Sequence, residues 1–549
     1  MTAAPMTEAA LAESGERAPG TPTWRDRVSV RVRRRDPRLV FWAAWAALLA
    51  LTGLWAVGNP MGAAPDEPSH IVKAAALVRE GTLGVETRPG VREAQVQRLY
   101  AMTHEMPGCY AFRSSEPATC WQGELVDLDR METAVTTAGN YNPLYYLVVG
   151  LPTLLPPSLD TLYLMRLAGA AFASLLLALG LRSVAEMPVN RWVVGGTAVA
   201  ITPMVVFMNS SVNPNAVEAS AGLGLWLTLL AALRHPDPAL VRRRWWRAGF
   251  LVVVLVNAKA LSPLFLALIV LTVVALAPWR NVTGALGDRR AWPGLGLGVV
   301  GSAFAVWWTL TSGGVAGADT VSFPELTPPT ALNTVLRLTT AYYHGLIGRF
   351  GWLDTRPPDL VYSWVTAVLG LLLILALAAA RRRDRWVLVA LVVVVVATPV
   401  VLQIPQAPFV GLPWQGRYLQ AVAVGVPIVA GLLCDRWLAD LRPRLARDVV
   451  RLVVGATVVV QVVSFAANLR RYVAGTEAPW FDPVDNPWLP PVPASLLLVG
   501  SLLAAAAVGA VLVWLAGGAP RAADADGPGP ELSPVRAAAD PAGSSRNRT

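Results

Sequence analysis

The sequence predicts an all-α polytopic membrane protein. More than half of its residues (54%) are hydrophobic, 15% are charged, and the mean hydropathy is +0.48. The apolar residues form runs of about 16 to 22, close to the roughly 20 residues with which a helix crosses a bilayer. Arginine clusters separate these runs, which is typical of segments on the cytoplasmic side of a membrane. We therefore expect a multi-span membrane domain over residues 39–516.

The first 38 residues are predicted to be a basic cytoplasmic tail. Seven arginines lie between Arg25 and Arg38, just before the apolar run at 41–57. The positive-inside rule places these arginines in the cytoplasm. No small-residue cleavage site follows the run, so we interpret it as an uncleaved anchor and the first transmembrane helix.

The remaining runs alternate in direction and bring the prediction to about twelve spans, with both ends of the chain in the cytoplasm. The arginines at 242–247 and 381–385 give the strongest cytoplasmic signals. Residues 517–549 are rich in Ala, Pro, Gly and charge, which predicts a disordered cytoplasmic tail. After the first span, the predicted spans are residues 161–181, 192–208, 216–233, 250–260, 261–277, 295–310, 360–380, 386–401, 419–434, 452–467 and 494–515.

Four loops are predicted outside the membrane, at about residues 58–160, 311–359, 402–418 and 468–493. In the first, an apolar run after Asn142 ends at the Pro156-Pro157 pair. This run is too short to cross a bilayer, so it predicts a short interfacial helix. The same loop contains Cys109 and Cys120, and outside the cytoplasm they can form a disulfide or remain two free thiols.

Charge and motifs exclude several classes of function. The net charge is +10, but the arginines lie in short segments between spans and act as topology signals. We therefore expect a lipid bilayer, and no nucleic acid, as a partner. The sequence contains no Walker loop and no GxGxxG after a strand, so it has no visible module for ATP or for a nucleotide sugar.

The most distinctive polar segment follows the first span and contains Asp66, Glu67 and His70. One carboxylate is a candidate general base for a substrate hydroxyl at the membrane edge. Alternatively, both carboxylates and the imidazole bind a divalent cation such as Mg²⁺ or Mn²⁺. A third interpretation is structural: a helix beginning at Pro68 would let Asp66 or Glu67 cap its free N–H groups.

Two cations are candidates for binding a phosphate attached to a lipid. Lys259 interrupts an apolar segment, where a charge usually faces a cavity or a partner. Arg417 lies between Gly416 and Tyr418, and a guanidinium suits bidentate phosphate binding. The alternatives are that Lys259 extends to the membrane surface and that Arg417 is an interfacial anchor.

Further polar and aromatic residues of the outer segments are candidates for contacting a substrate. Aromatic rings can stack on a sugar, while amides and carboxylates can bind its hydroxyls. Turn packing and helix capping are the structural alternatives for the 348–355 and 213–215 segments. These candidates are His70, Asn142, Tyr145, Asn213, Asn215, Arg349, Trp352, Asp354, Gln415 and Tyr418.

Three of these segments resemble a known family. Pro65-Asp66-Glu67-Pro68-Ser69-His70, Gly351-Trp352-Leu353-Asp354 and Gln415-Gly416-Arg417-Tyr418 resemble bacterial membrane proteins of domain-of-unknown-function 2142, over most of the chain. The wider architecture is similar to GT-C glycosyltransferases, which carry an acidic residue in the first outer loop. The sequence departs from that pattern at Asn142-Pro143, where related enzymes often have His-Pro-Pro.

The resemblance implies an inverting glycosyltransferase of the bacterial cytoplasmic membrane, with its active site facing outside. The donor would be a polyprenyl-phosphate-linked sugar, and the acceptor an envelope glycan, lipid or protein. We expect Asp66 to deprotonate the acceptor, Glu67 to support it or bind a metal, and Lys259 and Arg417 to stabilise the departing phosphate. A transporter or flippase of lipid-linked glycans and a non-catalytic scaffold are the competing functions.

Overall fold

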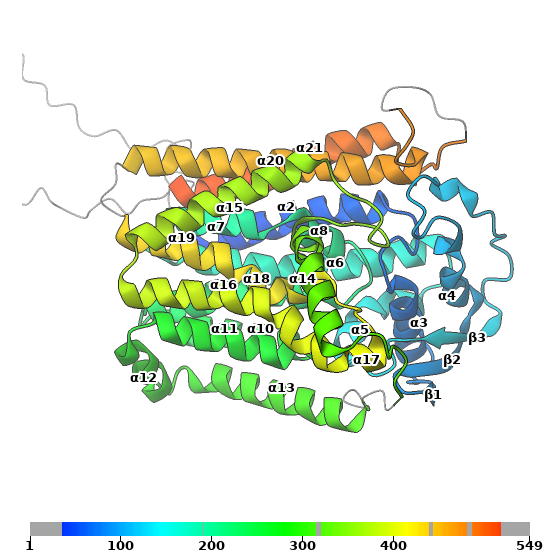
Figure 1. Ribbon diagram of the computed structural model, residues 1–549, viewed down its shortest axis with the longest axis horizontal. Helices are drawn as coiled ribbons and strands as arrows, with labels where there is room; N and C mark the ends of the chain where they lie inside the picture. Colours follow the sequence, from blue (N-terminus) through cyan, green and yellow to red (C-terminus); the bar gives the residue numbers. More distant parts are fainter. Residues whose placement is uncertain (1–35, 189, 314–319, 439–442, 480–485, 518–549) are drawn as a thin grey trace, which may run out of the picture. The chain divides into compact units, whose positions relative to one another are not determined.

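The computed structural model describes residues 36–188, 190–313, 320–438, 443–479 and 486–517 (Figure 1). The tail predicted for residues 1–38 lies outside this set except for its last three residues. The tail predicted for residues 517–549 lies outside it except for its first.

Most of the described chain is helical, as the sequence predicts. Nine helical segments in it are long and apolar enough to cross a membrane. They are α2 (Pro37–Val57), α6 (Leu159–Ala185), α9 (Asn215–Arg234), α13 (Trp292–Thr311), α15 (Asp359–Ala379), α16 (Arg382–Gln403) continued by α17 (Ala407–Val410), α18 (Gln420–Ala423) joined to α19 (Gly425–Trp437), α20 (Pro443–Ala474) and α21 (Ala494–Gly517).

Two bent helix pairs bring the number of candidate spans in the described residues to at most eleven. In one pair, α7 (Arg191–Ala200) and α8 (Pro203–Asn209) meet at 61°, and in the other α11 (Ser262–Leu276) and α12 (Trp279–Gly287) meet at 117°. Proline lies at both bends, at Pro203 and Pro278, and it cannot donate the backbone hydrogen bond that would continue a helix. The predicted number of about twelve spans is therefore not confirmed.

The difference arises mainly at residues 250–260, which we expected to be a separate span. They contribute the last turns of α10 (Val241–Val256), a 16-residue helix that begins in the basic 242–247 segment. With only 16 residues and an arginine-rich first half, α10 is not among the candidate spans. The chain then passes through a non-helical break at 257–261 before α11 begins.

The second outer loop contains a helix that the sequence analysis did not predict. This helix, α14 (Pro328–Ile347), is 20 residues long and begins with two prolines, which suit a first helical turn. Threonine, asparagine and arginine interrupt its apolar stripe, and Ala331, Val335, Gly345 and Ile347 are its buried residues. Such a helix gives no continuous apolar run.

The segment predicted as the first outer loop, residues 58–160, forms a small folded layer at one end of the long helices (Figure 1). It contains α3 (Glu67–Val78), α4 (Arg98–Ala101) and α5 (Leu144–Val149), together with strands β1 (Val85–Arg88), β2 (Val91–Gln97) and β3 (Met131–Thr136). The strands form an antiparallel sheet in the order β1-β2-β3, and α3 packs against β2, β3 and α5. We call this end of the helices the loop end. The strands were not predicted, because they are short and carry charged residues.

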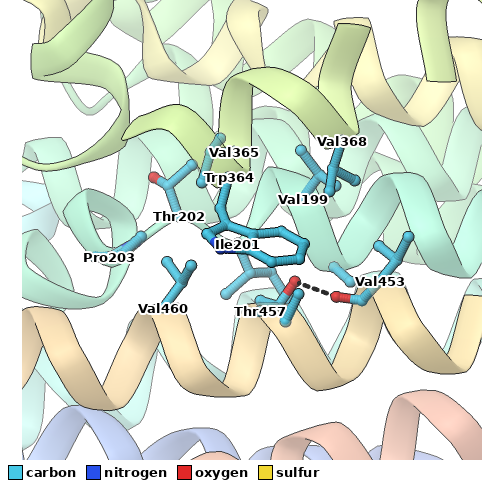
Figure 2. Close-up of a pocket in the computed structure, with 12 residues that line it drawn as sticks. Val199, Ile201, Thr202, Pro203, Trp364, Val365, Val368, Val453, Thr457 and Val460 are labelled. Carbon is cyan, nitrogen blue, oxygen red and sulfur yellow. Dashed lines mark hydrogen bonds between the residues drawn. The ribbon is translucent and has the colours of Figure 1, made fainter. Parts of the chain in front are cut away.

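The long helices pack closely, and the spaces between them are small and apolar. Figure 2 shows one such pocket, of about 20 Å³, between α7, α15 and α20. Valine, alanine and Trp364 line most of it, and the Thr457 hydroxyl donates to the Val453 carbonyl. This volume holds roughly one water molecule, so the pocket has no room for a substrate.

Candidate functional site

A much larger and more polar cavity lies at the loop end, with a volume of about 610 Å³. Its wall combines the first outer loop at 137–141, the break before α11 and the segment from α16 to Tyr418. The residues that give it its chemical character are Tyr141, Glu218, Lys259, Phe265, Trp414 and Tyr418. This volume is in the range of small-molecule binding sites.

Asp66 is not part of the cavity wall, and it differs from its neighbours in being exposed. Its side chain is 49% exposed, whereas residues 61–65 and 67–76 are buried. Asp66 directly precedes α3 and has a left-handed backbone (φ 65°), which aspartate tolerates better than most residues. Its carboxylate makes no capping hydrogen bond to α3. The capping interpretation of Asp66 is therefore wrong, because its charge faces outward.

Arg417 is the ion-pair partner of Asp66, and most of its hydrogen-bonding capacity is unused. Arg417 is 2% exposed, and its Nη2 lies 3.4 Å from Asp66 Oδ2. Its Nε and Nη1 are buried and have no hydrogen-bond acceptor among the described residues. A buried guanidinium with unpaired N–H groups is costly unless a ligand supplies acceptors.

Gly416 explains how Arg417 reaches this position. A Cβ at residue 416 would lie 2.0 Å from the Tyr342 carbonyl oxygen of α14, so glycine is needed for this close approach. The Arg417 guanidinium then lies 5.2 Å from the centre of the Tyr418 ring. The unpredicted helix α14 therefore fixes the segment that carries Arg417.

Lys259 lies on the other side of Tyr418. Its Nζ is 4.1 Å from the centre of the Tyr418 ring and donates to Asn215 Oδ1 at 2.9 Å. Asn213 Oδ1 accepts from the Asn215 side chain, and Asn213 Nδ2 donates to the Pro65 carbonyl, next to Asp66. These amides connect the start of α9 to the first outer loop. The structure thus brings together Asp66, Asn213, Asn215, Lys259, Arg417 and Tyr418, all candidates from the sequence.

Glu67 has a different environment from Asp66, although the two are adjacent. It is 0% exposed, and its two oxygens accept from Arg166 Nε at 2.8 Å and Nη2 at 2.7 Å. Oε1 also accepts from the Val212 backbone N–H. Our expectation that Glu67 supports catalysis or binds a metal does not fit this geometry, because both oxygens are already used within the protein.

The proposed metal ligands do not converge. His70 is buried, and its Nδ1 lies 2.8 Å from the Tyr146 hydroxyl. Burial, followed by the positive charge of Lys259, holds the pKa of His70 well below its usual value. No group of three His, Cys, Asp or Glu side chains in the described part of the chain is placed to hold a metal ion. The alternative of a cation bound by Asp66, Glu67 and His70 is therefore not supported by the geometry.

The other candidates in the first loop, Asn142 and Tyr145, do not line the cavity. Asn142 Nδ2 donates to Asn257 Oδ1 at 2.7 Å, which attaches the loop to the break after α10. Tyr145 lies in α5 and is 3% exposed, away from the cavity wall. Lys73 donates to the carbonyls of 138, 139 and 141 and so fixes the cavity wall formed by this loop. Burial, together with the charge of Arg92, lowers the pKa of Lys73 to about 7.

Candidates from the second outer loop gather in another place. Asp354 forms an ion pair with Arg471 at 3.0 Å, Trp352 Nε1 donates to the Gly62 carbonyl, and Arg349 Nε donates to the Leu353 carbonyl. None of the three lines the cavity. Their contacts support the alternative that this turn packs the loop onto its neighbours.

A disulfide closes the segment that surrounds Arg471. Cys109 and Cys120 are bonded, and the carbonyls of Tyr110, Arg113 and Glu116 within this loop all accept from Arg471. The disulfide loop therefore attaches the first outer loop to the end of α20.

Gln415 and Trp414 add unsatisfied polar atoms next to the cavity. Gln415 Oε1 and Trp414 Nε1 are buried and have no hydrogen-bond partner among the residues that the structure describes. The Trp414 backbone N–H donates to Gln403 Oε1, which holds the segment against α16.

Sequence reasoning assigned no role to Glu218, Arg166 or Arg471. Each is a charged residue near the end of an apolar run, and charges in such places usually have a partner or a function. This signal could have identified them as important. It could not have revealed that Arg166 pairs with Glu67, 99 residues earlier.

Comparison with known proteins identifies a family and no function. A family model described as "Predicted membrane protein (DUF2142)" matches residues 49–426, which include Asp66, Lys259 and Arg417. No curated protein and no solved structure matches the chain, so the wider similarity to GT-C glycosyltransferases stays a prediction. The match covers more than half of the 549 residues, and the chain therefore belongs to the DUF2142 family of predicted membrane proteins.

Proposed function

We propose that this membrane protein is a glycosyltransferase that moves a sugar from a polyprenyl-phosphate donor to an extracytoplasmic glycan, lipid or protein acceptor. One observation carries the proposal: the exposed Asp66 carboxylate pairs with the incompletely bonded Arg417 guanidinium, and the next residue, Tyr418, lines a cavity large enough for a sugar. A carboxylate accessible to a hydroxyl and cations with unused N–H donors are what such a transfer requires.

In the proposed reaction, Asp66 accepts the proton of the acceptor hydroxyl. The hydroxyl oxygen forms a bond to the anomeric carbon on the face opposite the phosphate, so the configuration inverts. The bond between the anomeric carbon and the phosphate oxygen breaks, and its electron pair stays with polyprenyl phosphate. Arg417 and Lys259 stabilise the negative charge that grows on the phosphate.

This assignment uses Asp66 alone as the base. Glu67 is assigned to structure, because Arg166 and the Val212 backbone occupy its oxygens. Arg417 is assigned to the phosphate, because its Nε and Nη1 need acceptors that the described residues do not supply. Lys259 is held by one amide and one aromatic ring, which leaves donors of its ammonium for an anion.

A flippase for lipid-linked glycans is the second candidate function. The bends of 61° between α7 and α8 and of 117° between α11 and α12 favour it, because broken helices are common in transporters. This function would use the same cations to bind the lipid phosphate but would need no base. Substitution of Asp66 therefore distinguishes the two functions, because only the enzyme needs it as a base.

The test uses the purified full-length protein in lipid vesicles with labelled polyprenyl-phosphate sugars. Wild type is expected to transfer the label to an acceptor, and Asp66→Asn is expected to bind the donor but transfer at least about 100-fold more slowly. Movement of the labelled lipid between leaflets, without transfer and equally fast in Asp66→Asn, would support the flippase and exclude the enzyme.

A further inference from the structure

Glu218 is a buried charge that the proposed reaction does not use. It lies in the first turn of α9, is 2% exposed and forms part of the cavity wall. A carboxylate is costly to bury unless donors surround it. The contacts of Glu218 therefore show which hydrogen-bond donors a ligand in the cavity has to supply.

Only one of the two Glu218 oxygens has a donor within the described protein. The Ser262 hydroxyl donates to Glu218 Oε1 at 2.5 Å and itself accepts from the Lys259 backbone N–H at 3.1 Å. The Ser262 hydroxyl is thereby oriented with its proton toward Glu218. No described residue donates to Oε2, and no described Lys or Arg forms an ion pair with Glu218.

Lys259 does not neutralise Glu218 by direct contact. Its ammonium is held by Asn215 Oδ1 and the Tyr418 ring instead. The amide of Asn215 thus holds the Lys259 ammonium out of direct contact with Glu218, although the two charges still attract each other, and Glu218 retains an acceptor oxygen of its own. The cavity wall therefore offers an anion site and, next to it, a separate carboxylate acceptor.

The rest of the cavity wall suits a molecule with apolar faces and many hydroxyls. Aromatic side chains are provided by Tyr141, Phe265, Trp414 and Tyr418, and an amide by Gln406. Aromatic rings pack on the C–H faces of a sugar, while amides both donate to and accept from its hydroxyls.

We infer that Glu218 is the residue that determines sugar specificity: its Oε2 accepts a hydroxyl of an uncharged donor sugar and repels a sugar that carries a carboxylate. The inference rests on the proposed function, since it places the donor sugar in the cavity and its phosphate on Arg417 and Lys259. A second carboxylate near Glu218 would be unfavourable, because like charges in a poorly solvated cavity repel each other strongly.

The inference is tested by binding, without any need for transfer. Wild type in lipid nanodiscs is titrated with a hexose 1-phosphate and with the matching hexuronic acid 1-phosphate, using ligand-observed NMR to obtain each Kd. Wild type is expected to bind the hexose compound at least about tenfold more tightly, which corresponds to about 1.4 kcal/mol.

Three variants identify the source of that preference. Glu218→Gln keeps the shape and an acceptor oxygen but removes the charge, so the two Kd values are expected to converge. Glu218→Asp keeps the charge and is expected to keep the preference. Glu325→Gln removes the same charge from an exposed residue and is expected to bind like wild type. Melting temperatures show that each variant is folded.

Each outcome judges the inference separately from the proposed function. Equal Kd values in wild type, no binding of either compound, or an unchanged preference in Glu218→Gln would overturn the inference. Selective binding in a protein that transfers no sugar would uphold the role of Glu218 and refute the enzyme. Sugar transfer by a protein that does not bind selectively would uphold the enzyme and refute the role of Glu218.

Discussion

Two arginine–carboxylate pairs lie near the start of α3, and they are built in opposite ways. In the first, Arg166 directs all five of its N–H groups to acceptors: the two Glu67 oxygens and the backbone carbonyls of 56, 59 and 60. In the second, Arg417 reaches only one Asp66 oxygen, at 3.4 Å, and its Nε and Nη1 have no acceptor among the described residues. The first pair is complete and the second is not.

The comparison shows how a protein separates stability from function in adjacent residues. A buried charge with all its hydrogen bonds satisfied fixes the surrounding backbone, whereas one left unsatisfied lowers stability unless a ligand completes it. Natural proteins retain such costs mainly at sites that bind or react. If the complete pair serves stability and the incomplete pair serves function, substitutions in the two pairs should have different effects.

The largest expected effect is on stability, in the complete pair. Arg166→Met leaves Glu67 as an uncompensated buried charge and is expected to lower the free energy of unfolding by about 3–5 kcal/mol. Thermal unfolding in detergent measures it. Arg417→Met is the matched control in the incomplete pair and is expected to melt close to wild type. Equal losses in both variants would remove the distinction between the pairs.

The next effect is on function, in the incomplete pair. Arg417→Met removes the cation assigned to the donor phosphate, so transfer is expected to fall about 100-fold. Arg417→Lys restores the charge without the bidentate geometry and is expected to recover only part of the loss. Initial rates over a range of donor concentrations measure both. Full activity in Arg417→Met would show that the unsatisfied N–H groups serve no substrate.

A smaller effect on function is expected at Asn215, whose amide holds Lys259. Asn215→Ala removes the amide that holds Lys259, and the ammonium is then oriented only by Tyr418. We expect kcat/KM for the donor to fall by about threefold to tenfold, because Lys259 both binds the phosphate and stabilises the charge that grows on it. An unchanged kcat/KM would show that the Asn215 amide is not needed to position Lys259.

The last prediction concerns pH and the wall of the cavity. The pKa of Lys73 is about 7 in the folded protein and near 10.5 in an unfolded chain. Between these values the unfolded state binds more protons, so the free energy of unfolding should increase as pH rises from 7 toward 10. Melting temperatures at pH 7 and 9 are expected to increase in wild type and to increase less in Lys73→Met. An equal increase in both would assign the pH dependence to other groups.

Much of the fold was predictable because apolar runs carry a strong signal. Runs such as 161–181 and 494–515 lie within α6 and α21. Prediction from the sequence failed where the hydropathy signal is weak. The helix α14 has a polar stripe, α10 begins in an arginine cluster, and the three strands are short and charged. Periodicity and hydropathy do not resolve such elements.

The site was predictable in composition but not in arrangement. Asp66, Lys259 and Arg417 were identified as unusual charges outside the arginine clusters, and the structure brings them together. The sequence could not distinguish Asp66 from Glu67, because the difference depends on Arg166, which is distant in sequence. It also could not place Trp352 and Asp354, because their partners lie in the first loop, at Gly62, and at the end of α20, at Arg471.

Asp66 and Glu67 are adjacent carboxylates with opposite proposed roles, and one paired measurement tests these roles. Asp66→Asn and Glu67→Gln are each assayed for sugar transfer per folded molecule and for melting temperature. Asp66→Asn is expected to melt like wild type and to lose transfer, whereas Glu67→Gln is expected to melt at a clearly lower temperature and to retain transfer in its folded fraction. Full transfer by Asp66→Asn, together with a catalytic loss in well-folded Glu67→Gln, would reverse the two roles.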